Sequence, residues 1–354
     1  MTSRACVLHG AHDLRLETRS VPPVGPEEVK VSILAGGICG SDLHYYHDGG
    51  FGPIRVREPI TVGHEAAGKI IEVGSRVTSV SVGDLVAINP SQPCGTCKFC
   101  RLGDHVHCLE MRFMGSAYRL PHEQGLFRDQ VVVPAGQVFA YRNNITAQEA
   151  ACAEPLAVCL HARAQAPGLK GRRVLITGAG PIGALCVAVA AQAKADEIVV
   201  TDLQDMPLAV AKNMGATSVI NLARDPDGLD GYKLEKGQFD VVFECSAAPA
   251  AIRAGLECLQ PRGTIVMVGV AGETPVPLNL IVSKEISIKG THRFSEEFAE
   301  AVSAIDTGTI PVNPIISPSF NIEDAVAAFD QAGDRSRAMK VHILFDDQGE
   351  GTRI

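Results

Sequence analysis

The chain has 354 residues, 46% of them hydrophobic, which is enough for two domains with separate cores. Its formal charge is -8 and no run of lysines and arginines stands out, so a nucleic-acid partner is not expected. The 11 cysteines are an odd number and no N-terminal signal peptide is recognisable, which favours reduced thiols in a cytoplasmic protein. The most apolar stretch, residues 182–195, is shorter than the roughly 20 residues of a membrane span and predicts a buried helix.

The first 140 residues contain short β-branched runs separated by Gly and Pro. The clearest runs cover residues 29–34, 67–73, 84–88 and 130–133. Short runs joined by long loops predict a mostly β domain shaped as a compact barrel.

After residue 154 the pattern changes to a repeat of strand, glycine turn and helix. Strands are predicted at 173–177, 197–201, 239–243 and 264–268, with helices at 181–195 and 206–214. This repeat is typical of an α/β fold with a doubly wound parallel sheet. Nearer the C-terminus, helices are predicted at 295–305 and 322–332 and a strand at 340–345, and the polar tail 346–354 is expected to fray.

Four cysteines lie close together at Cys94, Cys97, Cys100 and Cys108, in the pattern C-x-x-C-x-x-C-x7-C. Four thiolates can surround one zinc ion tetrahedrally and leave no position for water, which indicates a structural site. Accidental clustering is the alternative, but regularly spaced loop cysteines are rarely packing residues. The usual iron–sulfur spacings differ from this one. Residues 90–110 therefore predict a lobe that holds a structural zinc ion.

A second set of potential ligands consists of Cys39, His64 and Glu65. A thiolate, an imidazole and a carboxylate with an open fourth position are suited to a catalytic zinc ion. A lone Cys or His is more often a core residue, but the closed cysteine lobe nearby favours the metal interpretation.

Glu154 follows an apolar run and precedes a proline that would open a helix. Its carboxylate either caps that helix or adds a further oxygen ligand. Cys152 and Cys159 are rival ligands, but their apolar neighbours favour a packing role.

A glycine turn at residues 178–183 lies between an apolar strand and an apolar helix. It contains Gly178, Gly180 and Gly183, with Pro181 and Ile182 at the start of the helix. This is the context that the dinucleotide-binding fingerprint requires. Gly180 lets the backbone approach a pyrophosphate at the positive end of the helix.

Asp202 ends the next predicted strand, where a carboxylate can accept hydrogen bonds from both ribose hydroxyls and repel a 2′-phosphate. This favours NAD over NADP, and an ordinary turn aspartate is the alternative. Val268, Gly269 and Val270, after a later strand, are candidate contacts of the nicotinamide.

Four longer runs are more specific than the glycine turn. Residues 39–46, 89–94, 112–117 and 153–158 read CGSDLHYY, NPSQPC, RFMGSA and AEPLAV. With these runs the chain resembles the zinc-containing medium-chain alcohol dehydrogenases, polyol branch, over nearly its whole length. The resemblance implies a GroES-like catalytic domain made of residues 1–153 with 294–354, and a Rossmann dinucleotide-binding domain made of residues 154–293.

The resemblance also implies two zinc ions per chain, NAD as cofactor with NADP as the alternative, and a small sugar acid or polyol as substrate. No nucleic-acid or membrane partner is implied, and a homodimer or homotetramer is expected. Cys39, His64 and Glu65 match ligands of the catalytic zinc ion. Glu154 matches a position that binds zinc directly or through water.

Further roles are carried over by position. Ser41 matches the hydroxyl that hydrogen-bonds the zinc-bound alcohol, and His44 matches the histidine that passes its proton to solvent. His292 and Arg293 match positions beside the nicotinamide. Substrate contacts are implied at Tyr45, Phe113, Glu154, Arg293 and Phe294. Pro207 is a departure, because related enzymes can carry an arginine there near the adenosine ribose.

A sugar acid carries a carboxylate far from its reacting carbon, so a pocket that selects it should offer a cation at that distance. Arg112 and Arg293 are the candidates, and Arg112 discriminates better because Arg293 also suits neutral polyols. Alternatively, Arg112 lies at the surface or pairs with Glu110.

Two other functions compete with this one. A zinc-stabilised binding protein would not keep Cys39, His64 and the glycine turn together. A zinc-free quinone reductase would lack both metal sites.

Overall fold

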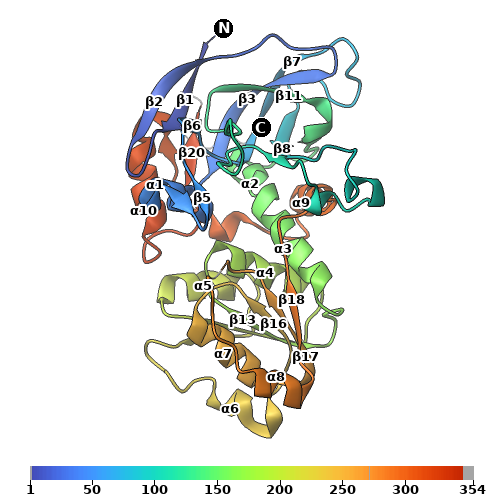
Figure 1. The fold of residues 1–354 in the computed structure, drawn as a ribbon, viewed down its shortest axis with the longest axis vertical. Coiled ribbons are helices and arrows are strands. Elements are labelled where there is room, and N and C mark those ends of the chain that lie inside the picture. The colour runs from blue at the N-terminus through green and yellow to red at the C-terminus, as the bar shows by residue number, and fades with distance from the viewer. Residues whose placement is uncertain (1, 271, 346–354) are drawn as a thin grey trace.

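Strands from the first 140 residues and from the C-terminal segment share one sheet. The computed structural model describes residues 2–270 and 272–345, and Figure 1 shows two bodies that meet at helix α3 (Ala153–Gln165). The predicted frayed tail, 346–354, lies outside the described residues.

In the upper body of Figure 1, a seven-stranded sheet has the order β12-β8-β7-β3-β20-β19, with β11 also paired to β3. These strands are β3 (Glu28–Gly37), β7 (Glu65–Val73), β8 (Leu85–Ile88), β11 (Gln130–Pro134), β12 (Val138–Ala140), β19 (Phe320–Asn321) and β20 (His342–Leu344).

The strands predicted in the first domain are confirmed, with ends that differ by a few residues. A second sheet, ordered β2-β1-β6, packs beside the first around a core that includes Val31, Ile33 and Phe127. Its strands are β1 (Thr2–Leu8), β2 (Leu14–Ser20) and β6 (Ile60–Thr61). Two short pairs complete this body: β4 (Gly50–Phe51) with β5 (Ile54–Arg55), and β9 (Ser91–Gln92) with β10 (Arg112–Phe113).

The second body is built on a six-stranded parallel sheet with the order β15-β14-β13-β16-β17-β18. Its strands are β13 (Arg173–Thr177), β14 (Glu197–Asp202), β15 (Ser218–Asn221), β16 (Phe239–Glu244), β17 (Leu259–Met267) and β18 (Ser287–Gly290). The doubly wound sheet is confirmed. The two outer strands, β15 and β18, were not predicted, because they are half-buried or exposed and carry no apolar run. The strand order reverses between β13 and β16, and ligands of such sheets bind at the carboxyl ends of the strands there.

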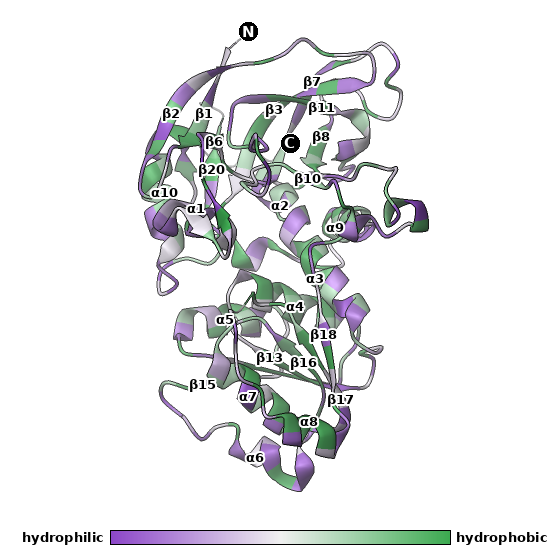
Figure 2. Cartoon of the chain, viewed as in Figure 1, coloured by the Kyte–Doolittle hydropathy of each residue, from purple (hydrophilic) through white to green (hydrophobic). Residues whose placement is uncertain are grey.

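Helices cover both faces of this sheet (Figure 1). They are α4 (Pro181–Gln192), α5 (Asp205–Asn213), α6 (Asp230–Lys233), α7 (Pro249–Cys258) and α8 (Leu278–Lys284). The predicted buried helix at 182–195 is α4, and Figure 2 shows its apolar colour next to the apolar strands β13 and β16. The helix ends at Gln192, earlier than predicted, and Lys194 has a φ of 59°, which a right-handed helix does not accept.

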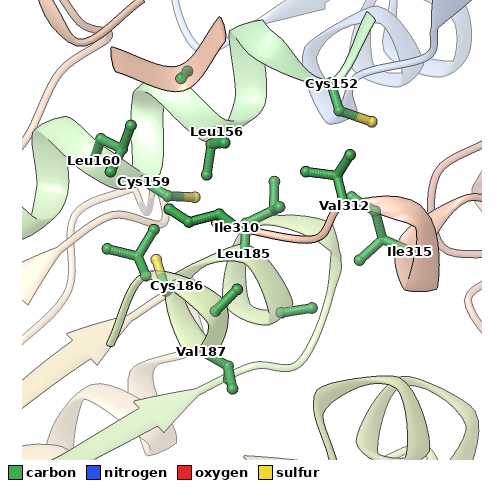
Figure 3. Close-up of a cluster of buried hydrophobic side chains, with 14 of the residues drawn as sticks. Cys152, Leu156, Cys159, Leu160, Leu185, Cys186, Val187, Ile310, Val312 and Ile315 are labelled. Atoms are coloured by element: carbon green, nitrogen blue, oxygen red, sulfur yellow. The ribbon is translucent and has the colours of Figure 1, made fainter. Parts of the chain in front are cut away.

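Packing between α3 and α4 joins the two bodies. Leu156 and Cys159 of α3 meet Leu185 and Cys186 of α4, with Ile310 and neighbours of the returning chain beside them (Figure 3). Helix α9 (Glu297–Asp306) packs on α3, and α1 (Gly40–Asp48), α2 (Ala147–Ala151) and α10 (Ala325–Gly333) belong to the upper body. The helix predicted at 322–332 begins as a 3-10 turn, Ile322–Asp324, before α10. Among the described residues, no helix has the length and apolar character to cross a membrane.

Candidate metal and cofactor site

Cys39, His64 and Glu65 come together where β3 ends and β7 begins. Cys39 is the N-cap of α1, and His64 immediately precedes β7, which starts at Glu65. Because β3 and β7 are antiparallel neighbours with Gly37 opposite Glu65, the three residues lie at the same end of the sheet. One potential ligand atom of each lies within 4.8 Å of the others. A sulfur, a nitrogen and an oxygen so arranged fit a zinc ion.

Asp42 contacts the His64 ring and the backbone of Cys39 and Gly63. Its carboxylate is fully buried, lies 3.6 Å from His64 Nδ1, and accepts the backbone N–H of Cys39 at 3.1 Å and of Gly63 at 3.3 Å. Burial acts to lower the pKa of His64, but Asp42 and Cys39 outweigh burial and raise that pKa well above its usual value. A carboxylate behind a ligating histidine fixes the orientation of the ring.

Glu65 has a buried cationic partner. Lys340 Nζ lies 2.8 and 2.7 Å from the two carboxylate oxygens of Glu65 and donates a third hydrogen bond to the carbonyl of Ile38 at 3.1 Å. Burial acts to lower the pKa of Lys340, but Glu65 and Cys39 raise it above its usual value. Removing one partner of such a buried pair leaves an uncompensated charge. The pair therefore holds the Glu65 carboxylate in place beside Cys39.

Glu154 lies in the first turn of α3 and is buried close to the same group. Burial raises the pKa of Glu154 to about 7, and the neighbouring His64 acts in the opposite direction. Among the described residues, no hydrogen bond joins this carboxylate to the free N–H groups of the helix, so it does not cap α3. Cys152 and Cys159 are fully buried in the apolar core, in agreement with packing roles.

The four cysteines of the 90–110 lobe converge on one point. Single sulfur atoms of Cys94, Cys97, Cys100 and Cys108 lie within 4.8 Å of one another. Backbone N–H groups of Cys94 and Cys97 point at sulfur atoms within the cluster, at 3.2 and 3.3 Å. Hydrogen bonds from the backbone of Thr96 and Cys97 lower the pKa of Cys94 to about 6, which favours a thiolate. The cluster fits a closed zinc site.

The glycine turn connects β13 to α4 as predicted. Gly178 has a φ of 87°, and a Cβ at Gly183 would lie 1.8 Å from the Gly178 carbonyl oxygen, so both positions require glycine. Gly180 is the N-cap of α4, and Pro181 is its first residue. A Cβ at Gly180 would meet one atom at 4.0 Å, the Arg335 guanidinium nitrogen. An open helix N-terminus beside an arginine suits a pyrophosphate.

Asp202 reaches back to this turn. One carboxylate oxygen accepts the N–H of Ala179 at 2.7 Å, and the other accepts those of Leu203 and Gln204 at 2.7 and 3.0 Å. An ionised carboxylate has about four acceptor positions, so one position remains for ribose hydroxyls. Pro207, the departure noted above, is buried in α5.

Two cavities border the remaining predicted cofactor residues. His44 and Val270, which belong to different bodies, line one cavity of about 530 Å³ together with the β4–β5 hairpin. Val268, Gly269, Val270 and His292 line a second cavity of about 590 Å³. The structure therefore places His44 opposite the segment predicted to contact the nicotinamide.

Phe113 and Arg293 extend the metal site toward the cysteine lobe. The Phe113 ring is 5.6 Å from the His64 ring, and the Arg293 guanidinium lies 4.2 Å from the Phe113 ring centre. Tyr45 is buried, and its hydroxyl accepts the N–H of Ala117 at 3.3 Å. A cation and an aromatic ring beside the metal group can contact a substrate bound there.

Two predicted substrate residues lie elsewhere. Arg112 is mostly exposed and pairs with Glu123 at 2.7 Å, so the alternative surface position is observed, although its partner is Glu123. Glu110 pairs instead with Arg119. Phe294 is buried against Phe298, with ring centres 5.5 Å apart, and packs in the core. Neither geometry supports a substrate contact.

Sequence reasoning missed Asp42, Lys340 and Arg335. Asp42 was detectable, because an acid three residues after a capping position often closes a helix N-terminus. Lys340 and Arg335 reach the site only through the returning C-terminal segment.

Two family models match the chain. An alcohol dehydrogenase GroES-like domain covers residues 25–143, and a zinc-binding dehydrogenase domain covers residues 181–307. The chain belongs to the zinc-containing medium-chain alcohol dehydrogenases, a family of oxidoreductases that use zinc and a nicotinamide cofactor. The predicted enzyme class is thereby confirmed.

Individual relatives within this family are named as dehydrogenases of a sugar acid or a polyol. The chain is 42% identical to L-idonate 5-dehydrogenase (NAD(P)(+)) of Escherichia coli over 89% of this chain and 91% of that protein. It is 34% identical to sorbitol dehydrogenase of Bacillus subtilis, over 93% of each chain. A crystal structure of the Escherichia coli L-idonate 5-dehydrogenase superposes with a TM-score of 0.93 at 38% identity, covering 98% of this chain and 99% of that one.

Proposed function

We propose that this chain oxidises L-idonate to 5-keto-D-gluconate, with hydride transfer to NAD or NADP. The observation that carries the proposal is the Cys39, His64 and Glu65 group with the half-buried Arg293 beside Phe113. Because this cation can bind either a carboxylate or polyol hydroxyls, the choice of a sugar acid rests on the relatives. The similarity to L-idonate 5-dehydrogenase supports the same substrate class. Sorbitol or xylitol is the alternative substrate.

Cys39, His64 and Glu65 would hold the catalytic zinc ion, with Glu154 as a further carboxylate. When bound, zinc supplies a Lewis acid that lowers the pKa of the substrate hydroxyl. The Lys340 ion pair fixes the Glu65 carboxylate, and Asp42 fixes the His64 ring. These contacts hold the donor atoms in place before the substrate binds.

Ser41 and His44 would carry the hydroxyl proton away. They lie three residues apart on α1, which places both side chains on one face of the helix, and His44 is half-exposed. His44 Nδ1 lies 3.0 Å from Asp48, which orients the ring. The path therefore runs from the metal group toward solvent along α1.

The glycine turn, Asp202 and the 268–270 segment would hold the cofactor, whose nicotinamide ring accepts the hydride. The open space at Gly180 leaves room for a pyrophosphate at the start of α4. His292 and Arg293 would lie near the ring.

Asp202 is expected to set the cofactor preference. Replacing Asp202 with Ala should lower kcat/KM for NAD by about tenfold or more, since charge-assisted hydrogen bonds worth about 1.5–3 kcal/mol are lost. The kcat/KM for NADP should change less, because the variant has no carboxylate to repel the 2′-phosphate of NADP. Asp202→Asn, which keeps an acceptor for the turn, should shift the ratio in the same direction. Steady-state kinetics with both cofactors test this, and an unmodified protein that uses both equally well would contradict it.

Arg293 is expected to recognise the carboxylate of the sugar acid. Arg293→Gln should raise the KM for L-idonate by about tenfold or more, through loss of a charge-assisted hydrogen bond, and raise the KM for sorbitol less. Arg112→Ala is the matched control, because Arg112 pairs with Glu123 at the surface and should leave both values nearly unchanged. If only Arg112→Ala affects L-idonate, the carboxylate is bound by Arg112 instead.

A panel assay tests the proposed reaction itself. Formation of reduced nicotinamide would be followed with L-idonate, sorbitol and xylitol, each with NAD and with NADP. The highest kcat/KM is expected with L-idonate. A higher value for sorbitol or xylitol would replace the sugar acid with a neutral polyol as substrate.

We also propose that the chain assembles into a homodimer or homotetramer. Strand β18 is an open sheet edge with every residue exposed, and Ile288 of this strand and Val282 of α8 add exposed apolar surface. The unpaired N–H and C=O groups of such an edge can pair with a strand of another chain. Sedimentation at the mass of a single chain would contradict the assembly.

A further inference from the structure

Glu244 is a buried carboxylate at the reversal of the parallel sheet. It ends β16 and has no exposed surface, and β16 lies beside β13, where the strand order changes. Its carboxylate accepts the N–H of Ser246 at 2.9 Å and the N–H of Ala247 at 3.0 and 3.1 Å. It also accepts the hydroxyls of Ser246 and Thr177. All of these partners donate, so the ionised carboxylate satisfies each of them.

Glu244 and the neighbouring Ser246 lie against the two segments predicted to hold the cofactor. The backbone carbonyl of Glu244 accepts the N–H groups of Val268 and Gly269 at 2.9 and 2.8 Å. A Cβ at Gly269 would lie 3.1 Å from the carboxylate oxygen Oε2, and a Cβ at Gly178 would lie 2.9 Å from Ser246. The carboxylate therefore lies directly behind the segment that would contact the nicotinamide.

The charge of Glu244 has no side-chain counterion. In residues 2–270 and 272–345, no lysine, arginine or histidine forms an ion pair with it. The hydrogen-bond donors around it are neutral backbone N–H and hydroxyl groups, so none of them places an opposite charge beside the carboxylate. Such a charge acts over a longer range than it would in water.

We propose, on the basis of the proposed function, that Glu244 makes the site bind the oxidised nicotinamide in preference to the reduced one. The oxidised ring carries one positive charge and the reduced ring carries none, so a nearby negative charge stabilises only the oxidised form. At an effective dielectric constant of about 20, a charge pair about 10 Å apart still changes a binding constant by about tenfold. Glu244 thereby favours binding of NAD+ and release of NADH without touching the substrate.

A different result is expected if Glu244 only holds the shape of the loop after β16. Its hydrogen bonds shape the loop after β16, in which Ala247 has a φ of 59°. If shaping were its only effect, every cofactor form would lose affinity equally when Glu244 is changed. The ratio of the NAD+ affinity to the NADH affinity therefore distinguishes an effect of the Glu244 charge from an effect of the loop shape.

The experiment is to measure the dissociation constants of NAD+, NADH and ADP-ribose by calorimetry for the unmodified protein and for Glu244→Gln. ADP-ribose lacks the ring and reports the remainder of the site. We expect the constant for NAD+ to rise about tenfold relative to that for NADH, with ADP-ribose changed by less than about threefold. Ser246→Ala, which removes one donor and keeps the charge, should keep the original ratio.

An unchanged ratio of NAD+ to NADH affinity in Glu244→Gln would overturn the inference, as would an equal loss for all three ligands. Should that variant not fold, Glu244→Ser removes the same charge, keeps an acceptor and carries the same expected ratio. An unmodified protein that binds neither NAD+ nor NADH overturns the proposed function and this inference together. One that binds both but loses no selectivity in the variants overturns this inference alone.

Discussion

Replacing Cys39 with Ser is expected to lower kcat/KM for the alcohol by about a thousandfold or more while the melting temperature falls by only a few degrees. A serine hydroxyl is a poor zinc ligand at neutral pH, and loss of the Lewis acid removes several kcal/mol of transition-state stabilisation. Cys39 lies at the surface-facing start of α1, outside the main core clusters. Its side chain therefore contributes little packing energy. Steady-state kinetics and thermal unfolding of the same preparation measure both effects.

Cys258→Ser is the matched control for this substitution. Cys258 is buried in α7, away from both groups of potential ligands. Its replacement should cost stability by burying a hydroxyl and leave kcat nearly unchanged. If Cys39→Ser retained full turnover, Cys39 would not be a ligand of a catalytic metal.

Replacing Cys100 with Ser is expected to lower the melting temperature strongly and the turnover less. The cysteine lobe has only a small cluster of its own, Cys100, Cys108 and Met111, so a bound zinc ion would supply most of its stability. We expect the melting temperature to fall by about 10 °C, corresponding to a loss of about 3–5 kcal/mol. Thermal unfolding combined with zinc analysis measures this, and one zinc ion per chain should be lost.

The lobe also borders the proposed substrate pocket. Arg119 donates to the carbonyls of Leu109 and Met111 at 2.9 and 2.8 Å and thus ties the lobe to the chain beside Phe113. Some loss of activity in Cys100→Ser is therefore compatible with a structural site. Equal losses of melting temperature in the Cys39 and Cys100 variants would contradict the division of the two sites.

Local patterns were sufficient for much of the fold and for the two groups of candidate metal ligands, whose atoms lie close together in the structure. The apolar run before Gly178 and the apolar run after it predicted β13 and α4, because burial on both faces of a parallel sheet leaves a continuous apolar signal. The four cysteines of the lobe are close in sequence, so their spacing alone indicated a common site. Cys39 and His64 were proposed as ligands from short motifs that lie next to the ends of the neighbouring strands β3 and β7.

Contacts between distant segments could not be predicted in this way. Lys340 is 275 residues from Glu65, and it reaches that carboxylate only because β20 pairs with β3, with His342 opposite Gly37. Arg112, which precedes Phe113, was one of two candidate cations for the pocket, with a surface position as the alternative. In a strand, however, neighbouring side chains point to opposite faces, and only Phe113 faces His64. The sequence alone does not show which of these two side chains of β10 points toward His64.

The central claim is that this chain is a zinc-dependent dehydrogenase of a sugar acid, and removal and return of zinc test it most directly. The protein would be assayed with L-idonate and NAD+ before treatment with a chelator, after treatment, and after addition of zinc. The account predicts two zinc ions per chain at the start, loss of reduced-nicotinamide formation as the catalytic ion is removed, and recovery when zinc is returned. Undiminished turnover in protein free of zinc would contradict it.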